Sequence, residues 1–71
     1  MKPRHDIQSH VRRHRLRLDL TQQELADRVG VTRQTILSIE KGKYSPTVGL
    51  ALGLARELGV SVEELFELEG K

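Results

Sequence analysis

The 71-residue chain contains no cysteine, which excludes a disulfide framework and a zinc site built from cysteine thiolates. It also lacks any apolar run close to the roughly 20 residues that a membrane-spanning helix needs. The first residues carry no apolar segment of the kind that marks a secretory signal. These absences predict a cytoplasmic protein that does not enter a membrane.

Catalytic motifs are absent as well. The sequence has no glycine-rich phosphate loop, no nucleophile elbow and no pair of carboxylates that a rigid scaffold would hold together. His10 and His14 have the four-residue spacing of metal ligands, but no third ligand on the same helix supports them, so we expect a solvated polar face. One small core leaves little room for a substrate cavity. We therefore expect no enzyme activity, no metal and no cofactor.

Charge is distributed unevenly along the chain. Residues 1–43 hold ten Lys and Arg against five Asp and Glu, a net +5, and residues 44–71 hold two against five, a net −3, which together give +2. A basic end suits a surface that meets phosphates, and an acidic end is left to solvent or to a partner. A solvated surface whose charges happen to segregate explains the pattern equally well, so charge alone does not decide the function.

Residues 21–40 read as two short helices joined by a tight turn. Thr21 is an N-cap residue, and Glu24 stands three residues later, where a capping box needs it. Gly30 ends the first helix, because a glycine adopts the left-handed conformation of a C-terminal cap without steric cost. Thr32 then caps the second helix. Local chemistry therefore fixes both ends of the turn.

The spacing inside this segment is typical of a DNA-binding helix-turn-helix. Ala26 is small enough to let two helices approach closely, and Gly30 follows four residues later. Ile36 and Ile39 come six and nine residues after the glycine and supply the apolar face of the second helix. The segment from Thr32 to Lys43 resembles the recognition helix and following turn of the Cro/repressor-type (XRE) helix-turn-helix family.

The resemblance covers residues 7–68 and implies an all-α fold, a compact five-helix bundle of the lambda-repressor-like type. Residues 1–6 would be a mobile N-terminal arm and residues 69–71 a frayed end. Arg15 shares the apolar stripe of the first helix with Ile7, Val11 and Leu18, and a charge on such a stripe needs a partner. The resemblance implies that this partner is Glu40, near the end of the recognition helix.

Two further helices are expected after the loop that contains Pro46. Thr47 caps a helix that reaches about Leu58, and Ser61 caps a last helix whose Phe66 enters the core. The buried face predicted for the longer helix consists of Val48, Ala51, Leu52, Ala55 and Leu58, widened by Leu50 and Leu54. Gly49 and Gly53 lie inside that helix, where they are either tolerated or mark the close approach of another backbone.

The exposed face of the recognition helix is the predicted DNA-reading surface. Arginine pairs with guanine, glutamine with adenine, and an apolar side chain touches the thymine methyl. Lysines at the helix end and the amides at the start of the preceding helix favour phosphates. The predicted base contacts are Thr32, Arg33, Gln34, Leu37 and Ser38. The predicted phosphate contacts are Thr21, Gln22, Gln23, Lys41, Lys43 and Tyr44.

The sequence thus predicts a small transcriptional regulator, a repressor, that binds double-stranded DNA at a specific sequence. A homodimer is expected, since two half-sites one helical turn apart give usable specificity. The fourth and fifth helices would form its interface through Leu54, Val62 and Leu68. The alternative is an antitoxin-like or adaptor module whose main partner is a second protein.

Overall fold

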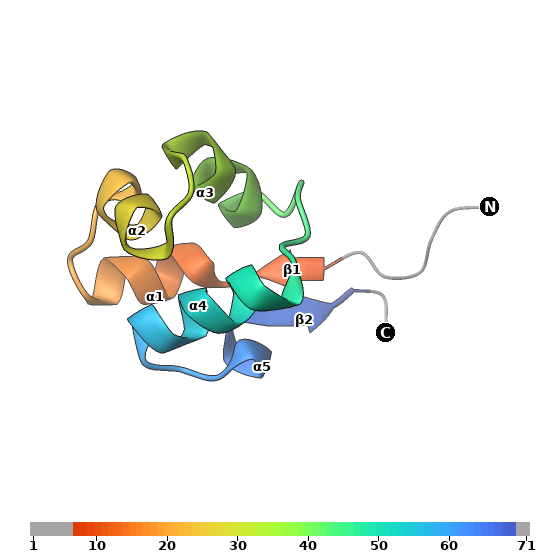
Figure 1. Ribbon diagram of the computed structural model, residues 1–71. Coiled ribbons are helices and arrows are strands. Elements are labelled where there is room, and N and C mark those ends of the chain that lie inside the picture. Colours follow the sequence, from red (N-terminus) through yellow and green to blue (C-terminus); the bar gives the residue numbers. More distant parts are fainter. Residues whose placement is uncertain (1–6, 70–71) are drawn as a thin grey trace.

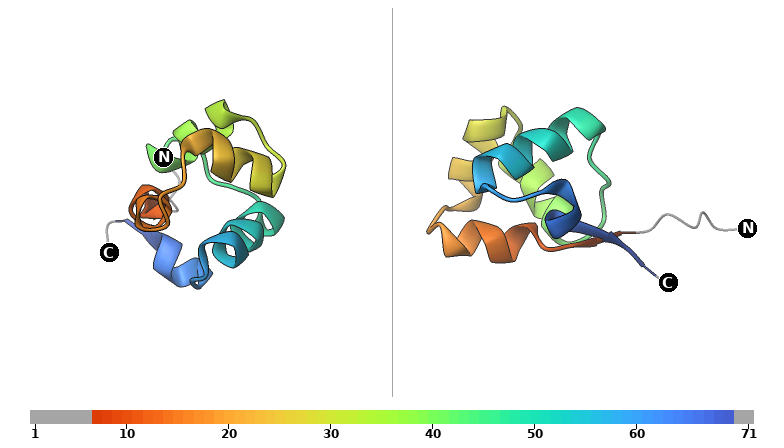
Figure 2. Two further views of the ribbon diagram at one scale, coloured as in Figure 1. Left: turned by 90° about the vertical axis from the view of Figure 1, so that its left-hand side faces the viewer. Right: turned by 90° about the horizontal axis from the view of Figure 1, so that it is seen from below.

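The computed structural model describes residues 7–69, so the predicted arm (1–6) and the last two residues of the predicted frayed end lie outside it. Five helices account for most of this part of the chain, and they surround one centre (Figures 1 and 2). The elements are β1 (Ile7–Ser9), α1 (Val11–Arg17), α2 (Gln22–Val29), α3 (Arg33–Glu40), α4 (Val48–Leu58), α5 (Val62–Leu65) and β2 (Phe66–Leu68). The expected five-helix, all-α class is confirmed. Across residues 7–69, every helix is too short or too polar to cross a bilayer.

Aliphatic side chains from all five helices build the core. Its largest fully buried side chains are Val11, Leu25, Ile36, Ile39, Leu54 and Leu65. Ala26 is also fully buried, and its small side chain lies on the helix that packs against α3, as the spacing predicts. The helix-turn-helix is therefore held by the same core that α1, α4 and α5 share.

Side-chain caps set the helix ends where the sequence predicts them. The Thr21 hydroxyl accepts a hydrogen bond from the Glu24 N–H (3.0 Å), and the Glu24 carboxylate accepts one from the Thr21 N–H (2.8 Å), which completes a capping box. Gly30 ends α2 at φ 77°, in the left-handed region. Thr32 accepts from the Thr35 N–H at 3.2 Å and starts α3.

The two strands correct the predicted ends of the bundle. Ile7 does not lie on the first helix, because β1 pairs antiparallel with β2 in the register Ile7 to Leu68. The last helix ends after one turn, and Phe66 is extended at φ −136° and ψ 138°, half-buried against the core. This pairing joins segments from the two ends of the described chain. The local sequence around each strand therefore does not predict it.

α4 buries part of the face that was predicted for it. Ala51, Leu54, Ala55 and Leu58 are buried as expected, whereas Val48 and Leu52, expected on the same face, are 77% and 57% exposed. The buried set is Ala51, Leu54, Ala55 and Leu58, with spacings of three, one and three residues. The segment is apolar nearly all round, so its sequence gave no polar face from which to infer the orientation. Leu54 is consequently unavailable for the dimer surface predicted above.

The end of α1 departs from the prediction in two places. Leu18, expected on the buried stripe, is 47% exposed, because α1 ends at Arg17 and Asp19 turns the chain with φ 58°. His14, expected on a solvated face with His10, is buried instead. His10 is partly exposed, and its Nε2 lies 3.1 Å from Glu67 Oε1 on β2.

Candidate nucleic-acid interface

α3 presents a polar face to solvent, on the side away from its two core isoleucines. Thr32, Arg33 and Gln34 are exposed at its start, and Leu37 and Ser38 are half-buried one turn later. Ile36 and Ile39 anchor the opposite side of the helix in the core. All five residues predicted as base contacts therefore line the outer half of one helix.

The residues predicted as phosphate contacts flank that helix. Lys41, Lys43 and Tyr44 are exposed in the segment that follows α3, and Thr21 and Gln23 are exposed at the start of α2. A hydrogen bond from Gln22 Nε2 to Glu40 Oε1 (3.0 Å) joins the start of α2 to the end of α3. The two flanking groups consequently lie near one another, although about twenty residues separate them in the sequence.

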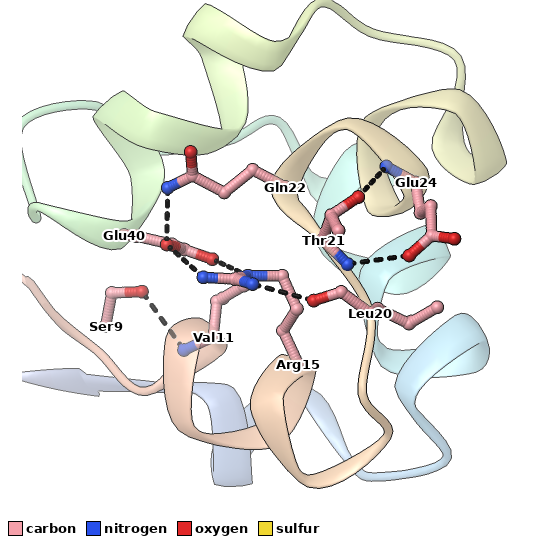
Figure 3. Close-up of polar contacts among 8 residues, drawn as sticks. All are labelled: Ser9, Val11, Arg15, Leu20, Thr21, Gln22, Glu24 and Glu40. Carbon is pink, nitrogen blue, oxygen red and sulfur yellow. Dashed lines mark hydrogen bonds and ion pairs between the residues drawn. The ribbon is translucent and has the colours of Figure 1, made fainter.

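An ion pair holds this junction against α1 (Figure 3). Arg15 Nε donates to Glu40 Oε2 at 2.6 Å, and Arg15 Nη2 donates to Glu40 Oε1 at 3.3 Å. The two side chains are only 8% and 3% exposed. The family resemblance implied this pairing, and the structure confirms it in the two-pronged geometry that arginine makes with carboxylates.

The network extends beyond the two charges. Arg15 Nη1 donates to the backbone oxygen of Leu20 at 2.7 Å, so the guanidinium also fixes the turn between α1 and α2 (Figure 3). Gln22 supplies a third donor to Glu40, a role that its place in the sequence did not reveal. Every oxygen of the Glu40 carboxylate is therefore hydrogen-bonded, which satisfies a buried charge.

The side chains of the two glutamines on α2 are engaged within the chain. Gln22 holds Glu40, and Gln23 Nε2 donates to Asp27 Oδ1 at 2.9 Å. The Glu24 N–H is engaged by the Thr21 hydroxyl, so the first-turn N–H groups left as candidate phosphate donors are those of Gln22 and Gln23, at the positive end of the helix dipole. The structure thus leaves the backbone of Gln22, and not its side chain, as the candidate phosphate contact.

Within residues 7–69 there is no cluster of three His, Asp or Glu side chains suited to a metal ion. His14 is 7% exposed, and both of its ring nitrogens are buried without a hydrogen-bond partner. Burial lowers the pKa of His14, and the neighbouring charges of Arg17 and Arg13 lower it further, against an opposing effect of Glu64. His14 is thus a buried residue whose pKa lies below its ordinary value.

Comparisons with known proteins agree with this geometry. A family described as helix-turn-helix matches residues 11–65. An HTH-type transcriptional regulator of Methanothermobacter thermautotrophicus is 57% identical over 60 residues, which cover 83% of this chain and 87% of that protein. The cryptic phage CTXphi transcriptional repressor RstR of Vibrio cholerae is 40% identical over 57 residues, which cover 80% of this chain and 51% of the repressor.

A solved structure shares the fold. The restriction-modification controller protein C.AhdI of Aeromonas hydrophila superposes with a TM-score of 0.70 at 28% sequence identity. The match covers 76% of this chain and 78% of that one.

Proposed function

This chain belongs to the helix-turn-helix family of transcriptional regulators, and from that premise we propose that it represses transcription by binding a specific sequence of duplex DNA. α3 is the recognition helix and lies in the major groove. The observation that carries the proposal is the buried Arg15–Glu40 pair, which fixes an α3 whose outer face is polar and exposed. The proposal assigns the chain a binding role and no catalytic step.

Arg33 and Gln34 are the proposed readers of base edges. Both are exposed at the start of α3, where a recognition helix enters the groove. A guanidinium pairs with guanine and a side-chain amide with adenine through two hydrogen bonds each. Thr32, Leu37 and Ser38 complete the proposed set of base contacts.

Lys41 and Lys43 are proposed to bind phosphates together with the first turn of α2. Their ammonium groups are exposed at the end of α3, beside the backbone N–H groups that the dipole makes attractive to anions. Such contacts position the protein but carry no sequence information. A DNA-binding role also places the chain in the compartment that holds the DNA, which we take to be the cytoplasm.

We further propose that two copies bind together. One domain of this size contacts few base pairs, and two half-sites about one helical turn apart raise the specificity. Leu54 is buried and takes no part, whereas Leu68 is 64% exposed on β2 and Val62 is half-buried on α5. Light scattering of the free protein and of its DNA complex measures the stoichiometry, and one copy on a single half-site would contradict the dimer.

Selection from a pool of random duplexes, read by sequencing, tests the function. We expect one enriched sequence with a repeated half-site. Gln34→Ala should lose about 1–3 kcal/mol on that site and relax the preference at one position of each half-site. Lys41→Ala is the matched control: it should weaken all sequences alike and reduce the salt slope of binding by about one unit. Recovery of no preferred sequence would refute the proposal.

A further inference from the structure

The DNA-facing side of α3 is hollowed where the helix meets the loop that follows it. The hollow measures about 260 Å³ and is lined by Gln34, Thr35, Ser38, Lys43 and Tyr44. Gln34 and Ser38 belong to the proposed base contacts, so the hollow opens within the surface that meets the groove. With α3 docked in the major groove as proposed, the hollow faces the edges of the base pairs.

Two of the lining residues offer apolar surface. The Thr35 hydroxyl lies 3.1 Å from the Thr32 hydroxyl, and this contact engages the polar atom of the side chain with the start of the helix. The methyl group of Thr35 is therefore the part of the side chain that is available to line the hollow. Tyr44 is 42% exposed and contributes an aromatic ring from the loop. The hollow thus adds apolar surface, in addition to that of Leu37, to a face whose other side chains are polar.

The chemistry of the major groove supplies one occupant for such a recess. Thymine alone among the four bases projects an apolar group into that groove, its 5-methyl. We propose that the hollow receives the 5-methyl group of a thymine, and that Tyr44 and Thr35 determine specificity at that position. The inference rests on the proposed DNA-binding function and adds one base position to it. It replaces the phosphate contact that the sequence predicted for Tyr44.

Replacement of thymine by 2′-deoxyuridine tests this directly, because it removes the methyl and keeps every hydrogen bond of the base pair. The probe is the duplex enriched by selection, with each thymine of one half-site replaced in turn. Burial of one methyl is worth about a fourfold change in affinity. We expect that deoxyuridine at one position of the half-site weakens binding by the wild-type protein about fourfold.

Three variants assign the effect to the hollow. Tyr44→Ala should bind the thymine and deoxyuridine duplexes equally. Thr35→Ser, which keeps the hydroxyl and loses the methyl, should reduce the preference for thymine. Tyr44→Phe is the matched control, since it keeps the ring and should keep the fourfold preference. Circular-dichroism melts of the three variants check that each one is folded.

Three results would overturn the inference: a selected site without thymine, affinity unchanged by uridine at every position, or a fourfold preference that persists in Tyr44→Ala. Each of these outcomes still includes specific DNA binding. If the protein selects no sequence at all, the proposed function itself is refuted. The two failures are therefore distinguishable.

Discussion

At the scale of single residues, Arg15 connects three parts of the chain. Its guanidinium contacts Glu40 at the end of α3 and the backbone oxygen of Leu20 before α2. Glu40 in turn accepts from Gln22 at the start of α2. The angle at which α3 leaves the core therefore depends on one buried cation and one buried anion.

Glu40→Ala should cost about 3 kcal/mol of unfolding free energy, because it leaves the Arg15 charge buried without its counter-charge. The double variant Arg15→Met, Glu40→Leu should recover much of this loss, since apolar side chains of similar volume remove both desolvation costs. Denaturant melts of the two single variants and the double variant close a thermodynamic cycle. A coupling energy near zero would show that the pair does not hold α3 to α1.

His14 gives the stability a pH dependence that the sequence did not predict. Burial, and then Arg17 and Arg13, lower its pKa below the ordinary value of 6.5, while Glu64 acts in the opposite direction and His10 adds a weaker lowering. A histidine with a lowered pKa binds its proton more weakly in the folded chain than in the unfolded chain. Its contribution to stability is therefore complete above the unfolded pKa and is lost as the pH falls from that value toward the lower folded pKa.

We accordingly expect the free energy of unfolding to fall as the pH drops from 7.5 to 5.5. His14→Leu should flatten the curve in that window, because leucine fills a similar volume and leaves no buried nitrogen unpartnered. Glu64 does not interfere, since the Ser61 N–H holds the pKa of its carboxyl below 4.5. Urea melts at a series of pH values provide the measurement, and equal slopes for the variant and the wild type would contradict the assignment.

At the scale of elements, the capped ends of α2 and α3 and the outward face of α3 were readable from the sequence, whereas the start of α1, the end of α5 and part of the buried face of α4 were not. Thr21, Thr32 and Gly30 act through neighbouring backbone, so their spacing was sufficient to place the ends of α2 and α3. Exposure of Val48 and Leu52 and the pairing of β1 with β2 depend on contacts between distant segments. Short periodic patterns do not encode such contacts.

The same substitution should have opposite effects at two glycines. Gly30 has φ 77°, where a Cβ is strained, so Gly30→Ala should destabilise by about 1 kcal/mol. Gly49 lies inside α4, and a Cβ there would meet no atom within 4 Å, so Gly49→Ala should stabilise by up to about 1 kcal/mol. Thermal melts of both variants measure the difference, and loss of stability at Gly49 would instead show that another backbone packs there.

The candidate site likewise combines features that follow from local spacing with features that depend on contacts between elements. Which residues face outward on α3 followed from helical spacing, and the structure places Arg33 and Gln34 at the exposed start of the helix. The bond between Gln22 and Glu40 and the hollow beside Tyr44 were not predictable, because each joins segments from different elements. The sequence therefore predicted which residues form the candidate reading face, and the tertiary structure shows how that face is held and shaped.

At the scale of the whole molecule, the central claim is that a rigidly held α3 reads the sequence of duplex DNA. The most direct test is the ratio of dissociation constants for the selected duplex and for a shuffled duplex of the same composition, at one physiological salt concentration. Specific regulators bind their sites at least about 1,000-fold more tightly than other DNA. We expect a ratio of that order for the wild type and a smaller one for Gln34→Ala. Equal affinity for the two duplexes would contradict the account.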